Sequence, residues 1–251
     1  MVNVLEKAFG ILEAIVASTP EPMVPAQLAK DLNLNRATCS RLLKQLMESG
    51  YVVKVSRQQG YAAGPKLLTM NNAARFEHEL LAAAVPVIDR CAEALKCSVL
   101  LAQLHQRKRY VLYHRNCSPV LDIRISRPCY DDIFSTATGL VLIAHSEVEE
   151  QIACLREQKA AGCRIFPGFG SEKMLKNQLR TISGAEGFDC EAGRQWIYAF
   201  PVFRDGRFCA ALGASIARNE HTPAFHRQVR KVLDQAAREI SSSLTPQYIV
   251  G

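Results

Sequence analysis

The chain has 251 residues, of which 48% are hydrophobic and 22% charged, and its formal net charge is +7. These values are typical of an ordinary globular protein with one large domain or two smaller ones, and the excess of cations permits a polyanionic partner without requiring one. The nine cysteines are scattered and include no CxxC pair, which excludes a standard zinc site and a disulfide framework.

The longest apolar run, residues 80–88, is too short to span a bilayer, and no charged-then-apolar signal segment opens the chain. The cysteines then fit reduced thiols that pack as small apolar side chains. We therefore expect a cytoplasmic protein that does not act on a membrane and carries no cofactor.

Three helices are predicted in the first 50 residues. Apolar residues recur at helical spacing over 4–16. Pro25 suits the first position of a short second helix, and Asn33 suits a tight turn because asparagine tolerates the left-handed region. Asn35 is a good N-cap for the third helix, and Gly50 is a natural residue to end it.

Residues 51–55 and 61–64 are apolar strand patterns around a polar, cationic turn, and they predict a small hairpin. The three helices and the hairpin predict a compact domain over 1–66. Helical spacing over 67–84 predicts a linker helix, and Pro86 predicts a break before a further helix at about 87–95.

The pattern of predicted secondary structure changes over 85–251, where strands and helices alternate without a regular βαβ period. Strand-like runs occupy 97–106, 109–116, 119–126 and a hairpin over 196–217 with an Asp205-Gly206 turn; helices are predicted over 133–145, 147–158, 171–183 and from Thr222-Pro223 onward. The fold class is therefore α+β with a mainly antiparallel sheet in the second domain.

The exposed face of the third helix carries side chains that contact bases and phosphates: Asn35, Arg36, Thr38, Ser40, Arg41 and Lys44. In a helix-turn-helix the N-terminal part of the second helix enters the major groove, and a hairpin after it forms a wing. Arg57 at the hairpin turn is then a candidate phosphate or minor-groove contact. Any exposed helix carries some arginine and lysine, so the order of helix, turn, cationic helix, glycine and hairpin carries the argument.

The sequence resembles the IclR family of bacterial transcription regulators along nearly its whole length. The similar stretches are "VLEKAFGILEAI", "LNLNRATCSRLLKQLMESGYV", "YAAGPKLLTM", "FSTATGLVLIAH", "GFDCE" and "YAFPVFRDGRFCAALGAS". The resemblance implies a winged helix-turn-helix, a linker helix and a GAF-like effector-binding domain. It also implies a homodimer or a dimer of dimers that binds double-stranded operator DNA and responds to a small organic or aromatic acid.

The resemblance places recognition residues at Asn35, Arg36, Thr38, Ser40 and Arg41, and it places the effector pocket at Thr136, Ala137, Glu191, Ile197, Gly213 and Ser215. The family's small-acid sensors often have Cys and Ser at the positions of Ile197 and Gly213. The apolar or bare residues here favour a larger, partly apolar acid or an aromatic compound, with Trp196, Tyr198 or Phe200 as possible walls.

Other functions remain as alternatives. "GASIA" at 213–217 resembles a nucleophile elbow around Ser215, but the elbow needs a strand, a sharp turn and a helix, whereas a strand is predicted through it. A cysteine nucleophile lacks a local signature, and His105, His114 and Cys117 match no standard metal spacing. A sensor that acts on protein partners and a redox role for Cys97 or Cys190 are further alternatives. We predict no enzyme and no metal site.

Overall fold

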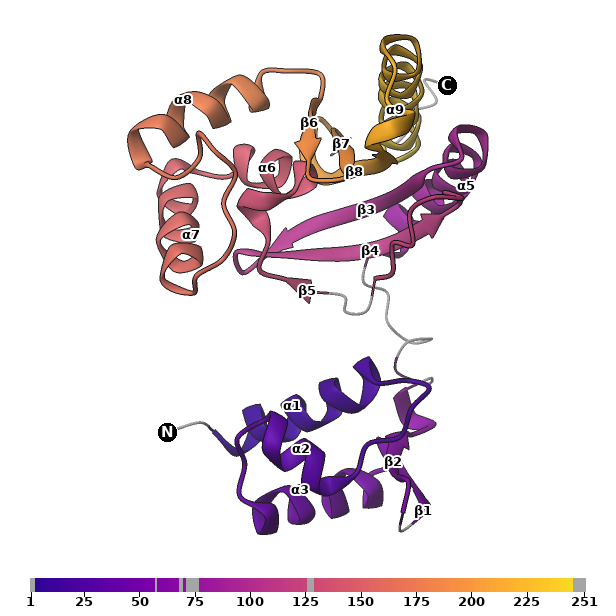
Figure 1. The fold of residues 1–251 in the computed structure, drawn as a ribbon, viewed down its shortest axis with the longest axis vertical. Helices are drawn as coiled ribbons and strands as arrows, with labels where there is room; N and C mark the ends of the chain where they lie inside the picture. Colours follow the sequence, from indigo (N-terminus) through magenta and orange to yellow (C-terminus); the bar gives the residue numbers. More distant parts are fainter. Residues whose placement is uncertain (1–2, 57, 68–69, 71–76, 126–128, 246–251) are drawn as a thin grey trace, which may run out of the picture. The chain divides into compact units, whose positions relative to one another are not determined.

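A computed structural model describes residues 3–56, 58–67, 70, 77–125 and 129–245. The chain divides into two compact units, Met1–Phe76 and Glu77–Gly251. Figure 1 shows the elements of each unit along the chain. Arg57 and residues 68–69 and 71–76 of the predicted linker lie outside the described residues.

The first unit contains the three predicted helices: α1 (Val4–Ala17), α2 (Pro25–Asp31) and α3 (Arg36–Glu48). Local residues define their ends. Asn3 and Glu6 form a capping box at the start of α1, Asn33 has φ 50°, and the side chain of Asn35 accepts a hydrogen bond from the Ala37 amide at 2.8 Å. Gly50, with φ 79°, follows the end of α3.

The core of this unit is made by one face of each helix and the first strand. Its buried residues are Ile11, Ile15, Leu28, Ala29, Cys39, Leu42, Leu43 and Val52. Met47 and Val4 are apolar but exposed, and each lies at an end of its helix.

Strands β1 (Val52–Ser56) and β2 (Gly60–Ala63) pair antiparallel and confirm the predicted hairpin. Two backbone hydrogen bonds hold the hairpin against the segment before α2. The Met23 amide donates to the Tyr61 carbonyl at 2.8 Å, and the Tyr61 amide donates to the Met23 carbonyl at 2.9 Å. Gly60 has φ 93°, and a Cβ there would lie 2.2 Å from the Met23 carbonyl oxygen, so only glycine permits this approach.

In the second unit, six strands form one antiparallel sheet in the order β5-β4-β3-β8-β7-β6. The strands are β3 (Ser98–His105), β4 (Lys108–Asn116), β5 (Cys129–Tyr130), β6 (Phe188–Ala192), β7 (Gln195–Arg204) and β8 (Arg207–Ala217). The β7–β8 hairpin turns at Asp205 and Gly206, both with positive φ, as predicted.

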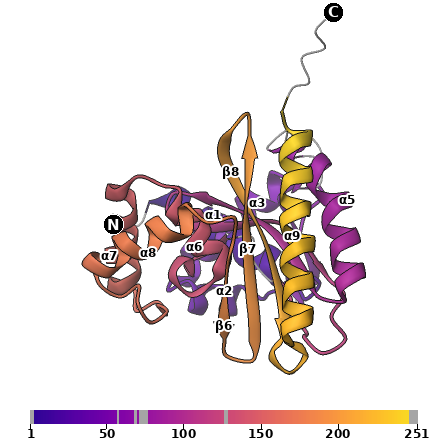
Figure 2. The same ribbon diagram turned by 90° about the horizontal axis from the view of Figure 1, so that it is seen from above.

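Helices cover both faces of this sheet (Figures 1 and 2). On one side α5 (His78–Leu95) and α9 (Pro223–Ser243) lie side by side; on the other are a 3-10 turn (Ile133–Ser135), α6 (Ala137–Ala144), α7 (Val148–Ala160) and α8 (Glu172–Ser183). Alternation along β7 sends Ile197 and Ala199 toward α6, and Tyr198, Phe200 and Val202 toward α5 and α9.

The predicted break at Pro86 is wrong, since α5 runs unbroken from His78 to Leu95 with this proline inside it. Proline leaves the Ala82 carbonyl without its helical hydrogen bond, a cost of about 3 kcal/mol. Burial of Leu80, Ile88 and Leu95 against the sheet and α9 offsets that cost. The predicted boundary between 84 and 85 consequently falls within a helix.

The predicted strand over 119–126 is also wrong for its described part, 119–125, which forms a loop. Side chains near its start bond its backbone and replace a strand partner. The Asn116 amide donates to the Leu121 carbonyl at 2.8 Å, and the Ser118 hydroxyl accepts from the Leu121 amide at 3.0 Å.

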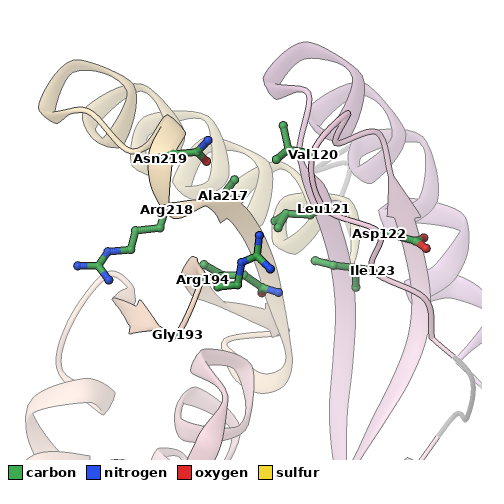
Figure 3. Close-up of a pocket in the computed structure, with 10 residues that line it drawn as sticks. Val120, Leu121, Asp122, Ile123, Gly193, Arg194, Ala217, Arg218 and Asn219 are labelled. Atoms are coloured by element: carbon green, nitrogen blue, oxygen red, sulfur yellow. The ribbon is translucent and has the colours of Figure 1, made fainter.

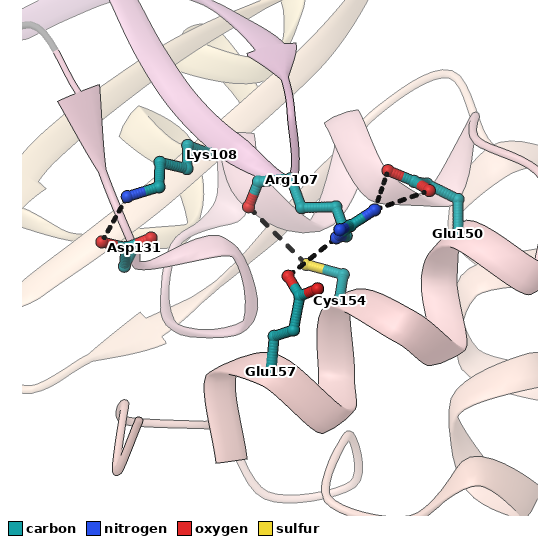
Figure 4. Close-up of polar contacts among 6 residues, drawn as sticks. All are labelled: Arg107, Lys108, Asp131, Glu150, Cys154 and Glu157. Atoms are coloured by element: carbon teal, nitrogen blue, oxygen red, sulfur yellow. Dashed lines mark hydrogen bonds and ion pairs between the residues drawn. The ribbon is translucent and has the colours of Figure 1, made fainter. Parts of the chain in front are cut away.

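The β3–β4 turn is anchored on α7 (Figure 4). Arg107 donates from Nε to Glu157 at 2.7 Å and from Nη1 to Glu150 at 3.3 Å, while the Cys154 thiol donates to the Arg107 carbonyl at 3.8 Å. The adjacent Lys108 pairs with Asp131 at 3.3 Å on the surface. These contacts hold the turn in place and leave Cys154 buried.

Candidate functional site

The outer face of α3 is the first candidate site. Asn35, Arg36, Ser40, Arg41 and Lys44 are exposed on it, and Thr38 is half-buried. Within the described part of the chain, Arg36 and Arg41 make no ion pair, and Lys44 makes only a 3.8 Å pair with Glu48 between two exposed side chains. Such a pair contributes little, so these three cations are available to an incoming polyanion.

The hairpin presents a second polar surface beside this helix. Lys54, Gln58 and Gln59 are exposed, and the Gln59 amide donates to the Ser56 hydroxyl at 2.9 Å, which closes the turn. Arg57 itself is not among the described residues, so its role remains a prediction.

The second candidate site is a cavity of about 220 Å³ between the sheet and the start of α6. All predicted effector residues except Glu191 line it, together with side chains from β4, the 119–125 loop and β7. The lining residues are Leu100, Arg109, Ile123, Ile125, Ser135, Thr136, Ala137, Thr138, Ala192, Gln195, Ile197, Tyr198, Gly213, Ala214 and Ser215.

Glu191 does not line this cavity. It pairs across the sheet with Trp196, so its side chain leaves the sheet on the face opposite Ile197, and it forms a 3.0 Å ion pair with Arg218. Its neighbour Ala192 faces the cavity instead. We therefore leave Glu191 out of the proposed ligand site.

Of the aromatic walls suggested for this cavity, Tyr198 is among the lining residues, whereas Trp196 and Phe200 are not. Phe200 packs against α5 and α9, and Trp196 stacks on His221 with ring centroids 3.9 Å apart. Tyr198 packs its ring into the same layer, and its hydroxyl lies 3.1 Å from His226 Nδ1. Side-chain alternation along β7 explains all three positions.

Thr136 shapes the polar end of the cavity as the N-cap of α6. Its hydroxyl accepts from the Gly139 amide at 3.1 Å and lies 3.1 Å from the Asp132 carbonyl, to which it donates. Gly139 permits this tight start, because a Cβ there would lie 2.3 Å from the Ile133 carbonyl oxygen. The first amides of α6, with their partial positive charge, therefore face the cavity.

Arg109 is a lining residue that the sequence did not indicate. It is 5% exposed and forms a two-pronged pair with Asp132, from Nε to Oδ1 at 2.7 Å and from Nη2 to Oδ2 at 2.5 Å. Its guanidinium also lies over the Tyr130 ring, 5.1 Å from the centroid. A buried charge needs such a partner, and a long-range contact of this kind has no signature in local sequence.

A wider groove of about 760 Å³ adjoins the cavity and shares Ile123 and Gln195 with it. Figure 3 shows Arg194 directed into this groove, with Val120 and Leu121 on the loop that faces it. The groove lies between the β6–β7 turn and the loop.

The rival chemical sites gain no geometric support. Ser215 lies within an uninterrupted β8, so the nucleophile elbow is absent there. No group of three or more His, Cys, Asp or Glu side chains is placed to hold a metal ion in the described ranges. Burial raises the pKa of Cys97 to about 12 and that of Cys190 to about 11, so neither thiol is disposed to react near neutral pH.

Two half-buried histidines make the second unit sensitive to acid. Burial lowers the pKa of His114, whose Nε2 is 2.8 Å from the Ser98 hydroxyl, and of His145, which stacks on Phe208. As the pH falls, these two side chains therefore take up protons earlier in the unfolded chain than in the folded protein.

We expect the melting temperature of this unit to fall as the pH drops below about 6.5, and the fall to continue until the lowered folded-state pKa values are passed. Calorimetry across this range measures it. His114→Asn and His145→Asn are expected to flatten the profile, whereas the same change at exposed His105 is the control. Equal slopes in all four proteins would contradict the assignment.

Comparison with known proteins bears on both sites. A family model of the IclR helix-turn-helix domain matches residues 4–56, which span α1 to β1. The chain is 28% identical over 196 residues to the glycerol operon regulatory protein of Streptomyces coelicolor, which covers 76% of this chain and 74% of that protein.

Solved structures share the fold over the whole chain. The IclR transcriptional regulator of Alicyclobacillus acidocaldarius has a TM-score of 0.78 at 17% identity, covering 97% of this chain and 99% of its own. An IclR homolog from Microbacterium hydrocarbonoxydans, complexed with 4-hydroxybenzoate, has a TM-score of 0.78 at 16% identity, with coverages of 96% and 99%.

The fold, a winged helix-turn-helix followed by an antiparallel effector-type domain, agrees with the fold of the regulators that this chain matches. The matched relatives are regulators rather than enzymes. None of the helices in the described segments is both long and apolar enough to cross a membrane. The chain thus carries a helix-turn-helix domain of the IclR type over residues 4–56, and it shares its fold with solved IclR transcriptional regulators.

Proposed function

We propose that this regulator inserts α3 into the major groove of operator DNA and that a small acid bound in the α6 cavity controls its operator affinity. The observation that carries the proposal is the exposed face of a capped helix, on which Arg36 and Arg41 have no ion pair among the described residues and Lys44 has only an exposed 3.8 Å pair with Glu48. Arginine forks match guanine edges, and lysine and hydroxyl groups match phosphates.

A pair of chains supplies the symmetry that an operator needs. Leu5, Phe9 and Val16 lie on one side of α1 and are 61%, 59% and 47% exposed, so they form an apolar stripe without cover in the first unit. Such a stripe supports pairing with the same stripe of a second copy. Two α3 helices related by a two-fold axis then read half-sites about one helical turn, or a multiple, apart.

The proposed ligand is a small, partly apolar carboxylic acid, aromatic acids included. The start of α6 offers amide hydrogens and a partial positive charge to an anion, while Ile197, Ile123 and Leu100 offer apolar walls. The 4-hydroxybenzoate complex of the Microbacterium homolog shows that this fold accepts such a molecule in that protein. Thr136, Ala137, Ile197, Gly213 and Ser215 are the contacts we propose here.

Control of DNA binding requires only that the ligand bind two conformations unequally. A difference of about 1–3 kcal/mol changes operator affinity roughly 5- to 150-fold. We infer that the segment between the two units transmits the change, and that the protein acts in the cytoplasm, where it meets chromosomal DNA.

Binding of the purified protein to DNA from upstream of its own coding region, measured against salt concentration, tests the proposal. Operator binding through phosphates is expected to weaken linearly with the logarithm of salt concentration, and a random duplex of equal length is expected to bind far less tightly. Equal weak binding to both duplexes at low salt would contradict sequence-specific regulation and would favour a sensor that acts on protein partners.

A further inference from the structure

The wall of the α6 cavity contains a buried cation, Arg109, that the proposed function does not use. Its side chain is 7% exposed, and it belongs to β4, whereas its counter-ion Asp132 precedes the 3-10 turn that leads into α6. We propose that Arg109 binds the carboxylate of the effector and selects acids over their neutral analogues. This inference rests on the proposed function, because it assigns a residue and a ligand group to the same cavity.

The hydrogen bonds to Asp132 leave part of the guanidinium free. An arginine has five N–H donors, and Asp132 takes one from Nε and one from Nη2. Among the described residues, no hydrogen bond from Nη1 is found. Two donors on Nη1 and one on Nη2 are then left at the cavity wall. The two oxygens of a ligand carboxylate can accept hydrogen bonds from them.

Asp132 also places the guanidinium next to the start of α6. The Asp132 carbonyl accepts from Thr136 Oγ1 at 3.1 Å and from Ser135 Oγ at 3.3 Å. The amides of Gly139 and Leu140 are already bonded to Thr136, so the amides of Ala137 and Thr138 are the ones left for a ligand. A carboxylate between Arg109 and these amides meets donors from two elements.

The charges favour an acid with one carboxylate at this end. Arg109 and Asp132 cancel when the cavity is empty, which keeps the buried pair compatible with folding. An entering carboxylate adds one negative charge, and the partial positive charge of α6 compensates for it. At the opposite end of the cavity, Ser215 and Gln195 offer hydrogen bonds to a hydroxyl, so the favoured ligand is a compact hydroxy acid with an apolar body.

The register of the sheet supports this orientation. Arg109 lies opposite Leu104 on β3, near the β3–β4 turn, whereas Ser215 lies opposite Ser98 at the other end of the same strand. The two residues therefore approach the cavity from opposite ends of β3, and Leu100, which lies between their partners on β3, lines it too.

Matched acid and amide probes test the role of Arg109. Benzoate against benzamide and 4-hydroxybenzoate against 4-hydroxybenzamide are titrated into the full-length protein, and the rise in melting temperature and the Kd are measured. Arg109→Met/Asp132→Leu removes the buried pair without leaving a lone charge, and Lys108→Met/Asp131→Leu removes the neighbouring surface pair as the control (Figure 4).

The wild type and the surface control are expected to prefer each acid over its amide about ten- to hundredfold, and the Arg109/Asp132 variant is expected to lose that preference. Retention of the preference in that variant would overturn the role of Arg109 and leave the proposed function standing. No preference in the wild type, with operator binding intact, would overturn both the acid ligand and the role of Arg109.

If the double variant does not fold, Arg109→Lys tests the role of Arg109 in its place. Lysine retains a charge opposite Asp132 but replaces the fork by a single ammonium group. We expect it to reduce the preference for the acid about tenfold. An unchanged preference would count against Arg109.

Discussion

Arg41→Ala is expected to weaken operator binding by about 1–3 kcal/mol, which corresponds to roughly 5- to 150-fold in Kd. Arg41 is exposed on the second turn of α3, and the described residues include no counter-ion for it, so its guanidinium is not held by the protein itself. If the fork reads a base edge, the loss falls on operator DNA and spares a random duplex. Fluorescence anisotropy with both duplexes measures the difference.

Arg227→Ala is the matched control, because it removes another exposed arginine, from α9 in the second unit, and changes the net charge by the same amount. A phosphate contact at Arg41 would lower affinity for both duplexes and reduce the salt slope by about one. Unchanged operator affinity in Arg41→Ala, with correct folding, would remove this residue from the DNA-binding surface.

Gly213→Ala is expected to destabilise the second unit by about 1–3 kcal/mol, because it overpacks the contact between β8 and α6. A Cβ at Gly213 would lie 2.3 Å from the Thr138 Cγ2 methyl and 3.2 Å from the Tyr198 carbonyl oxygen. Thr138 is buried and β-branched, so its methyl group cannot easily turn away. Thermal unfolding measures the loss, at about 2–4 °C per kcal/mol for a domain of this size.

Thr138→Ser removes the obstructing methyl and is expected to restore much of the lost stability in the double variant Gly213→Ala/Thr138→Ser. The pair forms a double-mutant cycle in which the coupling energy reports the contact. Gly170→Ala is the control, because a Cβ there meets no atom within 4 Å. Additive effects of the two changes would show that Thr138 does not define the space at Gly213.

The same contact explains a departure from the family's small-acid sensors. Where the serine typical of those sensors would project, the Thr138 methyl already fills the space above Gly213. The polar character of the cavity is thereby carried by Thr136, Ser215, Gln195 and the Arg109–Asp132 pair. The sequence indicated Thr136 and Ser215. It did not indicate Gln195 or the Arg109–Asp132 pair, since nothing near Arg109 in the chain marks it as buried.

Much of the first unit could be predicted because short-range interactions define it. Asn35 caps α3 through an amide two residues away, Asn33 and Gly50 supply backbone conformations that few other residues adopt, and apolar spacing marks the buried faces. The β7–β8 hairpin was equally accessible from Asp205-Gly206. The errors at Pro86 and at 119–125 arose where packing or side-chain bonds outweighed local preference.

The sequence by itself thus determined the order of the elements in the first unit, the ends of the α3 helix and the cationic face that we propose for DNA. Only the tertiary structure decided which side of β7 faces α6, and with it the separation of Glu191, Trp196 and Phe200 from the cavity. It alone brought Arg109 to Asp132, 23 residues further along the chain. The physical reason is that strand alternation defines two faces but not which of them a helix covers, and a buried charge pair depends on the folded core around it.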